Sequence, residues 1–218
     1  MSDTGKREIE RTVERSTMQS GPFAQFVLRV LGWLVVTLFV WWFTSPLLTW
    51  PVALLADLSA RIGFADLVQT VEQHGDSISF VTSLKAASST IGGNPSGLVS
   101  DKIDVRHYSF GLPLLAALIL AARAPHRLRN LLIGFAVSVP FQTWGVLAEF
   151  LSDVASGFGP IVASQTGFSA GQRELITFAY QFGTLILPTV VPAIVWVLMH
   201  RSVLQVFADS QTQPPSSG

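Results

Sequence analysis

Long uncharged segments alternate with short charged ones along this chain, and the uncharged segments have the lengths of membrane-spanning helices. The first and fourth, which follow Arg29 and Glu174, both exceed the roughly 20 apolar residues that cross a hydrocarbon core. The second, which follows Arg106, is short and spans only if its flanking arginines extend toward the headgroups. We therefore predict four transmembrane helices, over residues 22–45, 107–123, 130–150 and 175–200.

The first helix is predicted to end near the outer membrane surface. Pro46 and Pro51 remove backbone donors and are expected to break the helix there. Residues 46–62 are then an interfacial segment. Tryptophan is typical of membrane interfaces, and three tryptophans cluster at this point. We interpret them as interfacial anchors rather than as ligand-stacking residues: Trp41, Trp42 and Trp50.

Residues 63–106 are too polar for the membrane and too long for a simple turn. Residues 67–71 are apolar and partly β-branched, and the turn residues His74-Gly75-Asp76 follow them. Apolar and polar positions alternate in 78–82 and again in 103–105. The pattern predicts a small antiparallel sheet of two or three strands, with 86–97 as a loop. Such a sheet serves either as a structural cap or, through its exposed edge, as an acceptor of an extended peptide.

The remaining segments are polar. Residues 1–21 form a polar N-terminal segment, 151–174 a loop rich in Gly and Ser, and 201–218 a disordered tail. The short loop 124–129 is basic. With the N-terminus inside, nine Lys and Arg residues lie on the cytoplasmic side and five outside, so the positive-inside rule places both termini in the cytoplasm. A bacterial inner membrane fits this arrangement.

Composition agrees with a membrane protein and excludes several other classes. Of 218 residues, 49% are hydrophobic and only 13% are charged, about half the charged fraction of soluble domains. There is no cysteine, which excludes a disulfide scaffold, a thiolate metal site and a cysteine nucleophile. The net charge of zero indicates no nucleic-acid partner. The predicted fold is an all-α integral membrane protein of four helices with a small extracytoplasmic β subdomain.

Placing a polar side chain inside the membrane costs free energy, so each polar residue in the predicted helices needs a structural or functional reason. In the third helix, Gln142 and Glu149 share one face. In the fourth, a second polar face is expected, with Tyr180 beside it. Either the two faces hydrogen-bond to each other and hold the helices together, or they form an outward-opening site with Glu149 as its ionisable group. The second face comprises Thr177, Gln181, Thr184 and Pro188.

The sequence contains no recognisable catalytic set. There is no H-E-x-x-H pattern, no His/Asp cluster, no G-x-S-x-G and no phosphate-binding loop, so we expect neither a metal nor a cofactor. An enzyme is therefore the least favoured class.

Four phrases, in order along the chain, resemble a known family. They are WWFTSPLLTWPVALL, RHYSFGLPLLAALILA, PFQTWGVLAEFL and ITFAYQFGTLILPTVVPAIVWVL. Together they are similar to the exosortase H-associated membrane proteins of Gram-negative bacteria, over residues from about Val27 to Arg201. Exosortases are membrane enzymes that process C-terminal sorting signals and resemble cysteine proteases. This chain lacks cysteine, so the resemblance implies an accessory and not the sorting enzyme itself.

The favoured function is thus a non-catalytic accessory or scaffold that binds an exosortase-type enzyme or the tail of its substrate. Candidate contact residues are Phe110, Gly111 and Trp144. The alternative is a small transporter, channel or lipid-handling protein that uses the polar site around Glu149.

Overall fold

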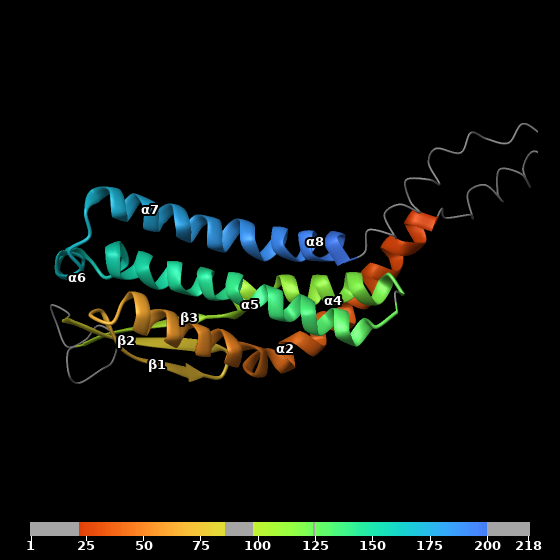
Figure 1. The fold of residues 1–218 in the computed structure, drawn as a ribbon, viewed down its shortest axis with the longest axis horizontal. Coiled ribbons are helices and arrows are strands. Elements are labelled where there is room, and N and C mark those ends of the chain that lie inside the picture. The colour runs from red at the N-terminus through yellow and green to blue at the C-terminus, as the bar shows by residue number, and fades with distance from the viewer. Residues whose placement is uncertain (1–21, 86–97, 124, 200–218) are drawn as a thin grey trace, which may run out of the picture.

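The computed structural model describes residues 22–85, 98–123 and 125–199. The predicted segments 1–21 and 201–218 and the predicted loop 86–97 lie outside the described residues. The described chain is mostly helical and includes one small sheet (Figure 1). Its elements are α2 (Pro22–Gly63), β1 (Val68–His74), β2 (Ser77–Lys85), β3 (Leu98–Asp104), α3 (Arg106–Ser109), α4 (Gly111–Ala121), α5 (Arg127–Ser152), η1 (Asp153–Gly157), α6 (Pro160–Gln165), α7 (Ala170–Gln181), η2 (Phe182–Ile186) and α8 (Leu187–Met199).

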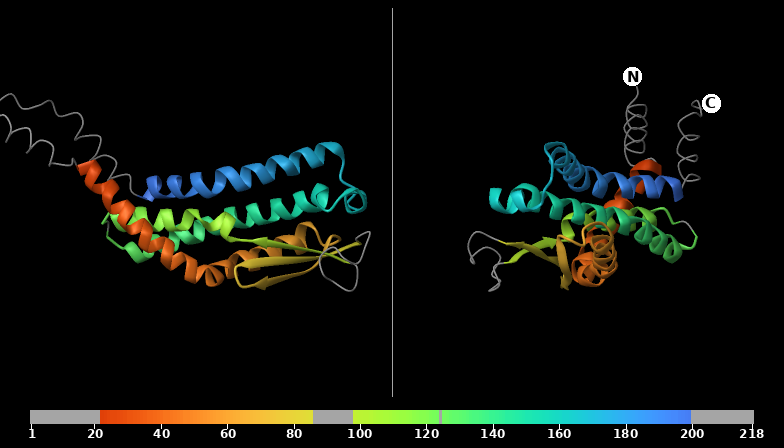
Figure 2. Two further views of the ribbon diagram at one scale, coloured as in Figure 1. Left: turned by 180° about the vertical axis from the view of Figure 1, so that it is seen from behind. Right: turned by 60° about the vertical axis from the view of Figure 1, so that its left-hand side comes forward.

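Helix α2 is continuous over 42 residues, so the predicted break at Pro46 and Pro51 is wrong. Both prolines lie inside the helix, which changes direction along its length instead of ending (Figures 1 and 2). A proline removes one backbone donor, and packing on neighbouring elements makes such a bend tolerable. The side-chain amide of Gln73 in β1 donates to the Pro46 carbonyl at 2.8 Å, which ties the sheet to the helix near the bend.

The predicted sheet is present, and within the described residues it has three antiparallel strands in the order β1-β2-β3. The β1–β2 hairpin turns at Gly75 and Asp76, where Gly75 has a φ of +66° that favours glycine. One face of the sheet is buried and carries Ile78, Phe80 and Ile103. The opposite face is polar, with Lys102 exposed.

Among the described residues, three helical segments are long and apolar enough to cross a membrane: Phe23–Gly63, Arg127–Gly157 and Ala170–Met199. The segment predicted as the second span forms a shorter apolar helix, Arg106–Ala121. The predicted loop 151–174 is largely helical, because α5 continues into the π-helical turn η1 and α6 follows. A capping box at Ser169 and Gln172 starts α7 before the predicted boundary at 175.

The elements are arranged in layers around α5. Segment α7–α8 lies on one side of α5, and the sheet with the second half of α2 lies on the other (Figures 1 and 2). Phe80 of β2 stacks on Phe150 of α5, with ring centroids 4.5 Å apart, in a core that includes Val52 and Ala56 of α2. A second core joins α4 to α8. The molecule thus has one end with the sheet, α6 and α7, and another with α4 and α8.

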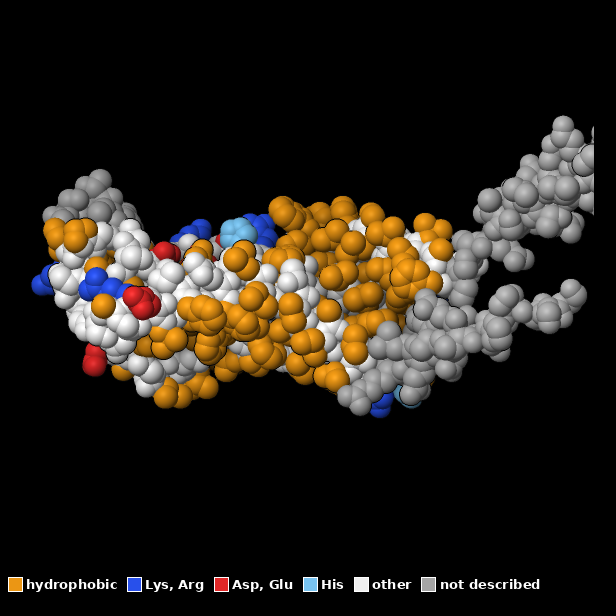
Figure 3. Space-filling view, turned by 90° about the horizontal axis from the view of Figure 1, so that it is seen from above, with side chains coloured by type: hydrophobic (Ala, Val, Ile, Leu, Met, Phe, Trp, Pro, Cys, Tyr) orange, Lys and Arg blue, Asp and Glu red, His pale blue; other side chains and the backbone are white. Residues whose placement is uncertain are grey.

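Hydrophobic side chains cover a broad band of the surface over α8 and α4, and they continue along α7 toward the sheet end (Figure 3). Charged and other polar groups gather at the sheet end, beyond this band (Figure 3). This distribution is that of a membrane-embedded body with a polar end.

Candidate functional site

Three polar side chains meet where α3, α5 and η2 converge. The hydroxyl of Tyr108 donates to Glu149 Oε2 at 2.6 Å and lies 3.5 Å from the hydroxyl of Thr184. Gly145 makes this possible, because a Cβ at that position would overlap the Tyr108 ring. Glu149 lies on α5, the predicted third span. Its hydrogen bond is therefore with Tyr108 of α3 and not with a polar face of the predicted fourth span.

Asp101 of β3 lies on the buried face of the sheet, near this cluster. It is 7% exposed, and its Oδ2 atom has no hydrogen-bond partner among the described residues. Burial, together with the negative charges of Asp153 and Glu149, raises the pKa of Asp101 to about 7. Because its neutral form is favoured in this environment, Asp101 is a group that changes charge near neutral pH.

An ion-paired arginine occupies the junction of sheet and membrane-embedded body. The Arg106 guanidinium donates to both carboxylate oxygens of Asp104, at 3.0–3.2 Å, and lies 3.0 Å from Asp76. Its guanidinium also lies 4.9 Å from the centre of the Trp42 ring, a cation–π contact. Burial alone would raise the pKa of Asp104, but the hydrogen bonds from Arg106 outweigh burial and lower it.

Two of the predicted anchors, Trp41 and Trp42, lie close to this arginine. Trp41 donates to Ser109 Oγ at 3.3 Å, and Trp50 on the next turns of α2 is 62% exposed. An open hollow of about 520 Å³ lies beside Trp41 and Trp42, and Phe110 is on its wall with 42% exposure. The structure therefore brings a predicted contact residue next to the predicted tryptophan anchors. The hollow is lined by Trp41, Trp42, Asp104, Arg106, His107, Phe110 and Thr184.

Gly111 is not available to a partner, so its prediction as a contact residue is wrong. It is buried where α4 crosses α8, and a Cβ there would overlap the Pro188 carbonyl oxygen and touch the Pro192 ring. In a regular helix, the N–H of residue 192 would donate to the Pro188 carbonyl, but Pro192 has no N–H. The backbone of α4 at Gly111 packs beside that carbonyl instead. Glycine is required at Gly111 for helix packing.

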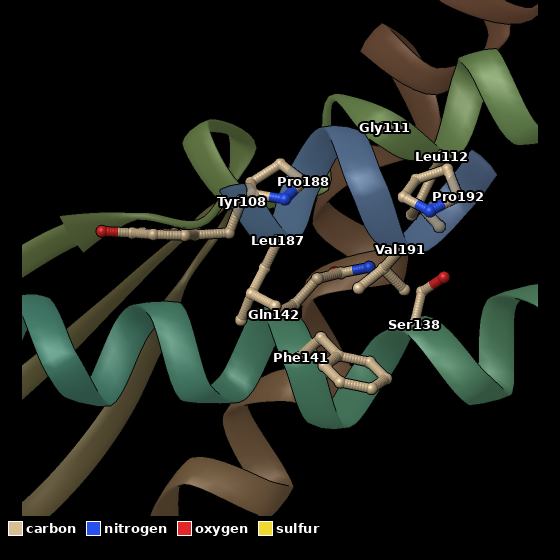
Figure 4. A pocket seen from close by; sticks show the side chains of 10 residues that line it. All are labelled: Tyr108, Gly111, Leu112, Ser138, Phe141, Gln142, Leu187, Pro188, Val191 and Pro192. Atoms are coloured by element: carbon tan, nitrogen blue, oxygen red, sulfur yellow. The ribbon is translucent and has the colours of Figure 1, made fainter. Parts of the chain in front are cut away.

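Gln142 is buried, as expected for an intramembrane polar group, and it faces α8 (Figure 4). With Ser138 it borders a cavity of about 10 Å³, which has room for at most one water molecule. Figure 4 shows Tyr108 extending away from the proline side of this cavity. Gln142 and Glu149 thus belong to two separate contacts.

Thr177 and Gln181 are exposed, so the interpretation of one continuous polar face on the fourth helix is wrong. Thr177 donates only to the Arg173 carbonyl of its own helix, at 2.9 Å. The π-helical turn η2 inserts an extra residue per turn between α7 and α8 and rotates one relative to the other. Spacings of three and four residues do not keep one face across such a turn. Tyr180, beside that face, is half-buried.

Trp144 is 52% exposed and remains available as a contact residue. Its indole N–H donates to the Ala179 carbonyl of α7 at 3.4 Å. Across the described ranges, no group of three or more His, Asp or Glu side chains has an arrangement that would hold a metal ion.

Sequence reasoning missed Tyr108 and Asp101 as members of the polar cluster. Tyr108 lies in an apolar segment and Asp101 in a strand whose partner was not evident, so neither carried a local signal. The alternation around 103–105 places Asp101 on the same face as Ile103, and a charged residue on the buried face of a strand is the one clue available.

The fold and these contacts define a helical membrane protein with a small sheet at one end. Residues 20–203 match the family model of the exosortase H-associated membrane proteins, and the chain belongs to that family. No curated protein and no solved structure matches it.

Proposed function

We propose that this protein is a non-catalytic accessory or scaffold of an exosortase-type sorting enzyme in a bacterial inner membrane. Family membership carries the proposal, because the family is described by its association with an exosortase. The chain has no cysteine, so it does not supply the nucleophile of cysteine-protease chemistry. Its role is then to bind the enzyme or the tail of the enzyme's substrate.

In this proposal the chain crosses the membrane four times, with both termini in the cytoplasm. The basic residues near 123–129 lie at the cytoplasmic surface, and the sheet lies outside. A sheet with open edges and a polar face is not stable in hydrocarbon, because its free backbone groups need water or a partner. The ion-paired Arg106 would mark the outer surface of the membrane.

Two features supply contact surfaces outside the membrane. Strand β1 is an edge of the sheet, and an extended peptide would add to it by main-chain hydrogen bonds. The hollow beside Phe110 combines aromatic walls with Arg106 and the carboxylate of Asp104. Both lie at the level where an exported protein's tail would meet the membrane.

The test is affinity purification of the tagged protein from its native membrane in a mild detergent, followed by mass spectrometry. We expect a cysteine-containing multispan enzyme in stoichiometric amount. An unrelated tagged membrane protein, purified in parallel, is the control. A homo-oligomer that carries lipid or a small molecule, with no such enzyme, would contradict the accessory role and favour a transport or lipid-handling function.

A further inference from the structure

Three carboxylates meet where the sheet docks on the outer end of α5. Glu149 and Asp153 lie four residues apart, on α5 and at the first position of η1, so they are neighbours on one helical face. Asp101 belongs to β3, whose buried face packs against α5 (Figure 1). The negative charges of Glu149 and Asp153 both act on Asp101. The three groups therefore share one small region.

Among the described residues, no positively charged side chain pairs with these carboxylates. None of the ion pairs that Arg and His residues form there includes Asp101, Glu149 or Asp153. Residues 86–97, which connect β2 to β3, contain no Lys, Arg or His. In the proposed topology, the basic residues of both terminal segments lie across the membrane. The cation that would balance these charges therefore comes from another molecule.

Asp101 is the member that most clearly lacks a partner. It is more than nine-tenths buried, with 7% exposure, and its Oδ2 atom has no hydrogen-bond partner among the described residues. Glu149, by contrast, accepts the Tyr108 hydroxyl. A buried polar atom without a partner costs stability, and a group that does so is typical of a binding site, where stability and function oppose each other.

The spread of the carboxylates selects the kind of cation. Across the described ranges, no group of His, Asp and Glu side chains is arranged to hold a metal ion, which needs its ligands within about 2–2.6 Å of one point. An ammonium group is likewise a compact point charge. A guanidinium is planar and carries five N–H donors, so it bridges separate carboxylates. Arg106 binds Asp104 and Asp76 in this way in the same protein.

The region is accessible at the membrane surface and is not a place for lipid chains. Glu149 and Asp153 are half-buried, and Ser156 on the following turn is exposed. Asp153 follows the predicted span 130–150, and the strand of Asp101 belongs to a sheet that needs water. An arginine carries its charge at the end of a long apolar stem, so it can reach a buried carboxylate from the surface.

We propose that Asp101, Glu149 and Asp153 form the binding site for one arginine side chain of the exosortase-type enzyme, presented at the outer surface of the membrane. The inference rests on the proposed function and names the chemistry of the contact.

The first experiment compares stability with enzyme binding at pH 8. Asp101→Asn and Asp153→Asn keep the shape of each side chain and remove its charge, whereas Asp66→Asn removes a charge from an exposed turn after α2. We expect each cluster variant to lower the amount of co-purified enzyme about tenfold or more, because the guanidinium loses a partner. Its melting temperature in isolation should be unchanged or higher, because like charges no longer repel. Asp66→Asn should leave enzyme recovery unchanged.

Wild-type recovery from both cluster variants would overturn the site while the accessory role stands. So would a loss of recovery that merely follows a lower melting temperature, since that is the mark of a structural role. Failure of the wild-type chain to co-purify with any sorting enzyme would instead remove the proposed function and the inference with it.

The second experiment identifies the partner side chain. The photo-crosslinker p-benzoylphenylalanine is placed at Ser156, three residues after Asp153, and, as the control, at Leu128, which is 71% exposed at the opposite end of α5. We expect position 156 to form an adduct with an enzyme segment that contains an arginine, and position 128 to form none with that segment. Replacing that arginine by glutamine in the enzyme should lower recovery as Asp153→Asn does, and the two changes together should cost no more than either alone.

An adduct with phospholipid alone, with a second copy of this chain, or with an enzyme segment that has no arginine would overturn the assignment. Additive losses from the arginine and Asp153 changes would also overturn it, because groups in direct contact are not additive. If the neutral variants do not accumulate, the adduct decides alone.

Discussion

The hydrogen bond from Tyr108 to Glu149 is the shortest tie between the sheet-end helix α3 and the long helix α5, at 2.6 Å. Hydrogen bonds to a charged group contribute about 1.5–3 kcal/mol when they are shielded from water. We expect Tyr108→Phe to lower the free energy of unfolding by about 1–3 kcal/mol, measured by thermal unfolding in detergent.

Thr177→Val is the control for this change, since the Thr177 hydroxyl is exposed and bonds only within its own helix. It should alter stability by less than about 0.5 kcal/mol. If both variants unfold at the same temperature as the wild type, the Tyr108–Glu149 contact is not a structural tie.

Asp101 predicts a dependence of stability on pH. Its pKa is raised to about 7 in the folded protein, against about 4 in an unfolded chain. The folded state therefore binds this proton more tightly, so stability falls as pH rises from about 4 to about 7 and stays lower above that. We expect Asp101→Asn, which is neutral at every pH, to raise the melting temperature more at pH 8 than at pH 5.

Asp66→Asn, on an exposed turn after α2, is the companion control for Asp101. A gain for Asp101→Asn that is the same at pH 5 and pH 8 would mean that the buried carboxyl is not the titrating group.

At the scale of elements, glycines decide how closely helices approach. Gly145 lies under the Tyr108 ring, and a methyl group there forces the ring or α5 to move. Overpacking of this kind costs about 1–3 kcal/mol. We expect Gly145→Ala to destabilise the protein by that amount in a detergent unfolding measurement.

Gly32→Ala tests whether this loss comes from packing. Nothing lies within 4 Å of a Cβ at Gly32, so alanine there should be neutral or slightly stabilising through its helix propensity. Loss of stability in both variants would point to a general effect of replacing glycine.

The elements were predictable where one local rule governs them. The strands followed from alternation of apolar and polar residues and from the turn at Gly75, and the long helices followed from apolar length. The predicted polar face of the fourth helix failed because periodicity assumes 3.6 residues per turn throughout, and η2 departs from it. The break at Pro46 failed because tertiary packing on the sheet holds α2 together through its bend.

The candidate site was less predictable than the fold, for a physical reason. Glu149 and Thr184 carried a signal because polar groups in apolar helices are rare. Tyr108 joins them across 41 residues of sequence from Glu149, and Asp101 reaches them only through the strand pairing. Contacts of this range depend on how the sheet docks on α5, which no local pattern encodes.

At the scale of the whole molecule, the apolar segment Arg106–Ala121 decides the topology. Its 16 residues rise about 24 Å, less than the roughly 30 Å of the hydrocarbon core. The segment spans the membrane only if charged residues at its ends draw the lipid headgroups inward and thin the bilayer locally. Arg106 at one end and Arg123 at the other are such residues. The sheet and the basic loop then lie on opposite sides of the membrane.

Because the chain has no cysteine of its own, a single introduced cysteine reports on which side of the membrane its position lies. Lys102→Cys on the polar face of β3 and Pro125→Cys in the basic loop stand on either side of the short segment, and both positions are exposed. We expect a membrane-impermeant maleimide to label position 102 in spheroplasts and position 125 only after permeabilisation. Labelling of both from the same side would show that the segment enters and leaves one leaflet. The chain would then cross three times, which would put its two termini on opposite sides of the membrane.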